Sequence, residues 1–164
     1  MRRTGTANAP QFGVVSSEPP RSTATSFAAA PLRVLLAEDD AEMRRLLVTT
    51  LRRNQCDVIE AKSGAQLWDL VVRCVLGAQR EQAVDLIISD VRMPGASGLE
   101  ILARLRTYDS TTPVIMITAF GDPETHAEAK RLGALAVFNK PFDLDDLRVL
   151  VASLRRLAPT QPAR

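Results

Sequence analysis

Short apolar runs alternate with amphipathic stretches along most of this chain. Five of these short apolar runs are interpreted as buried strands. After four of the runs, apolar residues recur every three or four positions, which is the spacing of one helical face. The stretch after the fourth run, about residues 123–132, is predicted to be a polar helix. Strict alternation of strands and helices predicts a parallel sheet covered on both faces, an α/β fold. The predicted strands are residues 34–37, 58–59, 86–88, 114–117 and 136–138.

The predicted helices are marked by their apolar positions and by capping residues. Asp40 is placed to cap the first helix, Gly133 to end the fourth, and the last is predicted to start at Asp143. Five strands with right-handed crossovers favour a flavodoxin-like, doubly wound (βα)5 sheet with strand order 2-1-3-4-5. The first helix carries the predicted apolar stripe Met43, Leu46, Leu47, Thr50 and Leu51.

The ends of the chain differ in composition from its middle. Residues 1–31 are rich in Thr, Ala, Ser and Pro and have no helical or strand period. Such a segment buries too little apolar surface to offset its ordering entropy, which predicts a disordered N-terminal tail. It is interpreted as a linker, with a localisation or partner signal as the alternative. Residues 32–157 form the predicted folded domain, and residues 158–164 a disordered C-terminal tail.

Composition excludes several classes of protein. Lys and Arg total 21 and Asp and Glu 19, so a net charge of +2 gives no general attraction to nucleic acid or membranes. No apolar run approaches the roughly 20 residues of a membrane span, and no apolar segment follows the basic start as in a secretory signal. Cys56 and Cys74 lack metal-ligand spacing and are predicted to be structural. We expect a cytoplasmic protein.

Polar side chains follow four of the five predicted strands. The carboxyl ends of parallel strands open on one edge of the sheet, where ligands bind in open α/β folds. Carboxylates gathered there stay ionised when a cation compensates them, and hard oxygen ligands suit Mg²⁺. A carboxylate nucleophile, a metal, a Lys and a Thr together suit acceptance of a phosphoryl group. The residues are Glu38, Asp39 and Asp40 after the first strand, Asp90 after the third, Thr118 after the fourth and Lys140 after the fifth.

Five segments with these residues carry a family resemblance. In this order and spacing, the chain resembles the receiver domain of bacterial two-component response regulators, over roughly residues 32–157, as a stand-alone receiver. The segments are residues 34–40 (VLLAEDD), 89–95 (SDVRMPG), 117–122 (ITAFGD), 131–134 (RLGA) and 139–142 (NKPF).

The resemblance implies a role for each matched residue. Asp90 is implied to accept the phosphoryl group, with Thr118 donating a hydrogen bond to it and Lys140 pairing with it. The implied Mg²⁺ ligands are Asp39 directly, Glu38 through water, Asp90 and the main-chain carbonyl of Arg92. Lys140-Pro141 is implied to be cis. From the residues alone, other readings stay open: helix capping for Asp39 and Asp40, a turn for Asp90, a strand-end hydroxyl for Thr118 and a solvated Lys140.

The implied function is signalling rather than enzyme catalysis. A histidine kinase or phosphotransfer protein would phosphorylate Asp90. A downstream protein would then bind the face formed by the fourth helix, fifth strand and fifth helix. No nucleic-acid or membrane binding is expected, and the protein is expected to be a monomer or a weak phosphorylation-dependent homodimer. Two other functions are disfavoured. A metal-dependent phosphatase of this topology has a general acid where this chain has Arg92. A DNA-binding regulator truncated to its receiver is the other, and no DNA-reading element is recognised in this sequence.

Some positions depart from the family pattern. Val137 stands where the family commonly has a switching Tyr or Phe, and neighbouring Phe138 points to the opposite face of the strand. This suggests, as the alternative function, an interaction module that does not need phosphorylation. Arg92 and Phe120 flank the site and predict an altered dephosphorylation rate.

Three other features carry predictions of their own. The segment 76–83 looks longer than usual, which suggests an extended second helix or loop. His126 is predicted to be solvated, and Trp68 to pack on the second helix.

Overall fold

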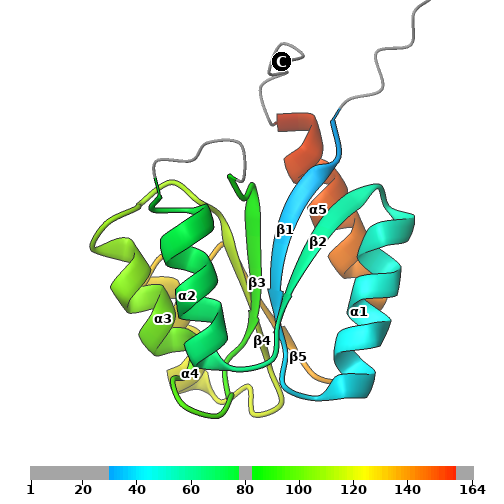
Figure 1. Ribbon diagram of the computed structural model, residues 1–164. Helices are drawn as coiled ribbons and strands as arrows, with labels where there is room; N and C mark the ends of the chain where they lie inside the picture. Colours follow the sequence, from blue (N-terminus) through cyan, green and yellow to red (C-terminus); the bar gives the residue numbers. More distant parts are fainter. Residues whose placement is uncertain (1–29, 78–82, 158–164) are drawn as a thin grey trace, which may run out of the picture.

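The computed structural model describes residues 30–77 and 83–157, and they form a parallel five-stranded sheet with helices on both faces (Figure 1). The strand order is β2-β1-β3-β4-β5, and all neighbouring pairs are parallel. The predicted fold class and strand order are therefore confirmed. The strands are β1 (Leu32–Ala37), β2 (Cys56–Ala61), β3 (Leu86–Asp90), β4 (Val114–Thr118) and β5 (Ala136–Asn139).

The helices divide between the two faces of the sheet. In β1, Leu35 and Ala37 belong to a core with α2, α3 and α4, whereas Val34 and Leu36 belong to a core with α1 and α5. This division follows from the strand period of two. The helices are α1 (Ala41–Arg53), α2 (Gly64–Cys74), α3 (Gly98–Arg106), α4 (Pro123–Arg131) and α5 (Leu144–Leu157).

Short polar side chains start the helices at the carboxyl edge of the sheet. As predicted, Asp40 caps α1, and its carboxylate accepts a hydrogen bond of 2.7 Å from the amide of Met43. Ser97 and Glu100 form a capping box at the start of α3, directly after the loop that follows Asp90. These caps fix the loops that surround the carboxyl ends of the strands.

A few sequence predictions differ from the structure. Leu46 was placed in the buried stripe of α1 but is 47% exposed, and Val48 is buried in its place. Helical spacing alone does not fix the edge of a stripe, because its width depends on the neighbouring elements. The Asp143 carboxylate accepts a hydrogen bond from the amide of Asp145, and α5 begins one residue after Asp143. The predicted tails, apart from residues 30 and 31, lie outside the described residues.

The remaining predictions about the chain are partly tested. Cys56 and Cys74 are free and buried, as expected of structural thiols. Helix α2 ends at Cys74, and most of the segment predicted to be long, residues 78–82, lies outside the described part. In the described ranges, no helix is long and apolar enough to cross a membrane.

The start of α2 touches the loop that follows Asp90. The amide of Gly64 donates a hydrogen bond of 3.2 Å to the carbonyl of Pro94. A Cβ atom on Gly64 would lie 1.9 Å from the carbonyl oxygen of Ala96, which is backbone and has no flexible end to move. Glycine at position 64 thus allows α2 to support the loop that carries Arg92.

Replacing Gly64 by Ala should destabilise the protein by about 2 kcal/mol, because the clash forces backbone to move. In a helix without this contact, the same change would stabilise by up to about 1 kcal/mol. Urea unfolding measures the difference. Ala65→Ser, at the exposed neighbouring position, is the control and should change stability little. A Gly64→Ala protein as stable as the wild type would contradict this role of the glycine.

Candidate functional site

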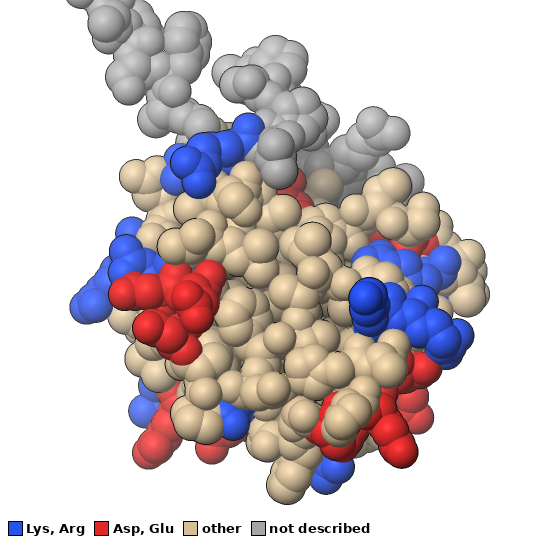
Figure 2. All heavy atoms as spheres, turned by 180° about the vertical axis from the view of Figure 1, so that it is seen from behind, with Lys and Arg blue, Asp and Glu red and all other residues tan. Residues whose placement is uncertain are grey.

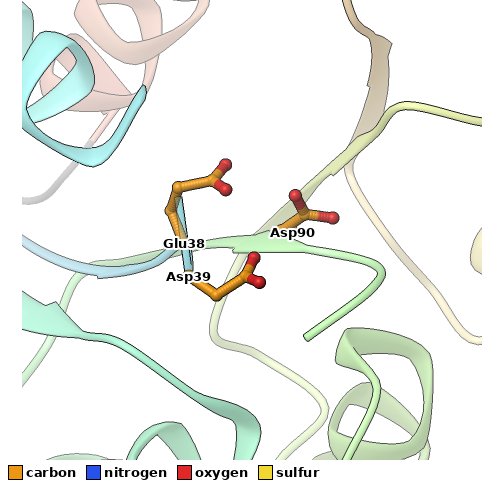
Figure 3. A group of neighbouring side chains, drawn as sticks. All are labelled: Glu38, Asp39 and Asp90. Carbon is orange, nitrogen blue, oxygen red and sulfur yellow. The ribbon is translucent and has the colours of Figure 1, made fainter. Parts of the chain in front are cut away.

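Three carboxylates converge at the carboxyl edge of the sheet. Glu38 and Asp39 directly follow β1, and Asp90 is the last residue of β3, which lies beside β1. One oxygen from each carboxylate lies within 4.8 Å of the other two. Figure 3 shows the three side chains pointing toward one another. Glu38 and Asp90 are 1% and 5% exposed, and Asp39 is exposed to solvent.

Lys140 completes this group from the end of β5, the strand at one edge of the sheet. Its Nζ lies 2.7 Å from Glu38 Oε2 and 2.5 Å from Asp90 Oδ2. The Lys140-Pro141 peptide bond that follows β5 is cis, as the family resemblance implied. Burial alone would lower the pKa of Lys140, but hydrogen bonds to Asp90 and Glu38 outweigh it and raise that pKa above 10.5. Lys140 is therefore a cation held between two buried carboxylates, not a solvated side chain.

Burial also shifts the pKa of Glu38, one of the two carboxylates that bind Lys140. It raises the pKa of the Glu38 carboxyl above 4.5, and the nearby Asp90 charge acts in the same direction, against the hydrogen bond from Lys140. With all groups ionised, three carboxylates and one ammonium leave a formal charge of −2. An all-oxygen site with this charge fits a divalent cation such as Mg²⁺.

Thr118 and Arg92 lie beside the site but contact it differently. Thr118 is 1% exposed, and its hydroxyl accepts a hydrogen bond of 3.1 Å from the amide of Phe120. In the described part of the chain, no hydrogen bond joins Thr118 to Asp90. The amide of Arg92 donates a hydrogen bond of 2.8 Å to Asp90 Oδ1. Both oxygens of Asp90 are thus held, one by Arg92 and the other by Lys140.

The two residues that flank the site also touch each other. The guanidinium carbon of Arg92 lies 4.4 Å from the ring centroid of Phe120, a cation–π contact. Their amides are bonded to Asp90 and Thr118 respectively. The stacked side chains are therefore anchored at two residues of the site.

His126, predicted to be solvated, is partly exposed but also has a side-chain partner that the sequence did not predict. This residue is half-buried, and its Nε2 lies 2.8 Å from Oδ1 of Asn139, the residue before Lys140. The polar pattern of α4 could not reveal a partner on another element. Trp68, on α2, is partly buried against the core, as predicted, and the guanidinium carbon of Arg104 lies 3.9 Å from its ring centroid.

Sequence reasoning did not assign a role to Arg44. This arginine is 9% exposed on the core side of α1, and its Nη1 donates to the main-chain carbonyls of Glu38 and Asp39 at 2.9 and 3.3 Å. A signal was present in the sequence, since a charged residue lies one turn before buried Leu47 and four residues after the Asp40 cap. A charged residue on a buried helical face needs a partner, which indicates a specific contact.

Comparison with known proteins agrees with this geometry. The sequence profile of the response regulator receiver domain matches residues 34–152. The chain belongs to the response regulator receiver family. Receiver domains are signalling domains of two-component systems rather than classical enzymes, and they interact with histidine kinases or phosphotransfer proteins.

Similar proteins include both short and long chains. Sporulation initiation phosphotransferase F of Bacillus subtilis strain 168 is 34% identical over 116 residues, which cover 71% of this chain and 87% of that protein. The response regulator protein PilR of Pseudomonas aeruginosa is 34% identical over 125 residues, covering 76% of this chain and 26% of PilR. The chain thus spans about a quarter of the length of PilR.

Solved receiver structures share the fold. The Francisella response regulator 1452 receiver domain has a TM-score of 0.68 and 28% identity, and the match covers 77% of this chain and 98% of that one. The Vibrio cholerae chemotaxis protein CheY4 has a TM-score of 0.65 and 28% identity, covering 76% and 99% of the two chains.

Replacing Lys140 by Met should make the stability of the metal-free receiver domain fall as the pH rises. The pKa of Glu38 is already above 4.5 in the folded protein, and loss of the ammonium raises it further. The folded state then binds protons that the unfolded chain has released, so its stability declines from pH 4.5 up to the raised pKa. The expected decline is about 1.4 kcal/mol for each unit by which that pKa increases.

Urea unfolding in EDTA across this pH range measures the effect. The wild-type protein should show a smaller decline, and the exposed-site control Lys62→Met should follow the wild type. Parallel stability curves for Lys140→Met and wild type would contradict the electrostatic account of the site.

Proposed function

We propose that this receiver domain accepts a phosphoryl group on Asp90 from a histidine kinase or phosphotransfer protein and then binds a downstream protein with altered affinity. The observation that carries the proposal is the placement of the Asp90 carboxylate. It lies at a strand end, buried, beside two further carboxylates and bonded to Lys140. A buried carboxylate held in one orientation, with cations to neutralise incoming charge, suits phosphoryl transfer.

In the proposed transfer, an oxygen of Asp90 attacks the phosphorus of a phosphohistidine. The P–N bond breaks, its electron pair stays on the imidazole nitrogen, and an acyl phosphate forms on Asp90. Lys140 exchanges its contact with Asp90 for one with a phosphoryl oxygen, and the Thr118 hydroxyl donates to another. Glu38, Asp39, Asp90 and the main-chain carbonyl of Arg92 would hold Mg²⁺, which neutralises the transferring oxygens when bound.

The same contacts suggest how the state of Asp90 reaches a partner. Lys140 directly follows β5, and Thr118 ends β4 four residues before the Asp122 cap of α4. A change at either residue therefore acts on the α4-β5-α5 face, where Leu135 and Val149 are 47% and 67% exposed. Figure 1 draws β5 behind the other strands, and Figure 2, seen from that side, shows a broad uncharged area between groups of charged side chains.

The proposed signal is a shift between two conformational states. A cytoplasmic protein, monomeric or weakly dimeric when phosphorylated, fits this role. Val137, at the place of the usual aromatic, is half-buried against the core of α2, α3 and α4. The alternative is a receiver that binds its partner without phosphorylation. It is suggested by Val137, because the usual switching aromatic is missing at this position.

Phosphoryl acceptance can be measured by intact mass after incubation with Mg²⁺ and a small phosphodonor such as acetyl phosphate. The wild-type protein should gain one phosphoryl group, and Asp90→Asn should gain none, because the amide is not a nucleophile of this kind. Asp69→Asn, at an exposed position on α2, is the control and should gain mass as the wild type does. A gain that persists in Asp90→Asn would contradict the proposal, and no gain in any protein would favour the alternative.

The Arg92–Phe120 stack generates a second prediction. Phe120→Ala removes the cation–π contact and frees Arg92, so water reaches the acyl phosphate more easily. A contact of about 0.5–1 kcal/mol corresponds to dephosphorylation faster by roughly two- to fivefold. The decay of phosphorylated protein after removal of the donor measures the rate, with Tyr108→Ala as an exposed aromatic control. An unchanged or slower decay in Phe120→Ala would refute this role for the stack.

A further inference from the structure

The buried side chain of Arg44 binds the main chain of the loop that carries Glu38 and Asp39, two of the three carboxylates. Nη1 of Arg44 donates to the carbonyl oxygens of both Glu38 and Asp39, at 2.9 and 3.3 Å. Nε of the same side chain lies 3.6 Å from Oε2 of Glu60 on β2. Arg44 thus connects the loop after β1 to β2. It contacts the main chain of Glu38 and Asp39, whereas the carboxylates of these residues lie next to Asp90.

The two carboxylates depend on this contact to different degrees. Glu38 Oε2 is held by Lys140, and Glu38 Oε1 accepts a hydrogen bond of 3.2 Å from the amide of Asp40. The exposed Asp39 carboxylate makes no hydrogen bond or ion pair with any other described residue. Its position follows from the main chain, and Arg44 is the side chain that fixes the main-chain carbonyl at that residue.

We propose that Arg44 is a positioning residue for the cation site: it holds the main chain of Glu38 and Asp39 so that their carboxylates face Asp90 before a cation binds. The inference rests on the proposed function, because it concerns the same Mg²⁺ site. Preorganised ligands bind a metal more tightly, since the cation does not have to order the loop. A purely structural Arg44 would affect unfolding but not the affinity of the folded protein for Mg²⁺.

The central experiment compares Mg²⁺ binding by calorimetry in folded variants. Arg44→Met keeps the length and apolar stem of the side chain but removes its donors, and should raise the dissociation constant for Mg²⁺ about tenfold. Arg44→Lys keeps the charge and one donor group, and should fall between Met and wild type. Arg45→Met, at the exposed neighbouring position, is the matched control and should bind Mg²⁺ as the wild type does.

Two further readouts separate positioning from stability. In the metal-free protein, hydrogen exchange at the amides of residues 39 and 40 should be faster in Arg44→Met than in Arg45→Met. In Mg²⁺ titrations of phosphorylation by acetyl phosphate, the half-maximal Mg²⁺ concentration should rise while the rate at saturating Mg²⁺ stays near wild type, because the bound cation restores the loop.

The outcomes distinguish the inference from the function on which it rests. If Arg44→Met does not fold, Arg44→Lys and Glu60→Gln test the same contact, and each should weaken Mg²⁺ binding measurably. Folded Arg44 variants that bind Mg²⁺ within twofold of wild type would overturn the positioning role and leave the proposed function intact. A wild-type protein that binds no Mg²⁺ would overturn the proposed metal site and the inference with it.

Discussion

The structure depends on keeping the charge of Asp90 buried at the end of a central strand. An isolated carboxylate there would be costly to desolvate, and two further carboxylates lie beside it. The ammonium of Lys140 compensates part of this charge from the opposite end of the sequence, 50 residues from Asp90 and 102 from Glu38. The (βα)5 topology makes that ion pair possible, because it brings the carboxyl ends of β1, β3 and β5 to one edge.

Around the Lys140–Asp90 ion pair, three further features position parts of the site. Arg92 donates its amide to Asp90, Arg44 holds the carbonyls of the acidic loop, and Gly64 allows α2 to approach the loop after β3. Of the three clustered carboxylates, that of Asp39 is the one without a hydrogen bond or ion pair to a described residue, and it is also the exposed one. Hydrogen-bonded main chain and one carboxylate without a partner are features that suit the proposed cation site.

Much of the fold and site could be predicted from the sequence because the relevant signals are local. Apolar runs ending in Asp39, Asp90, Thr118 and Lys140 place these residues at strand ends, and parallel topology brings strand ends together. The contacts of His126 with Asn139 and of Arg44 with Glu60 could not be predicted in this way, since each joins different elements. The exposure of Leu46 escaped prediction for a related reason, because packing partners set the edge of a helical stripe.

The central claim is that Asp90, rather than a neighbouring carboxylate, becomes the acyl phosphate. The most direct measurement is chemical trapping. Borohydride reduces an aspartyl phosphate to homoserine, and peptide mass spectrometry then identifies the modified position. After treatment with a phosphodonor and Mg²⁺, the account predicts homoserine at position 90 and aspartate or glutamate unchanged at positions 38 and 39. Homoserine at another acidic position, with Asp90 unmodified, would contradict it.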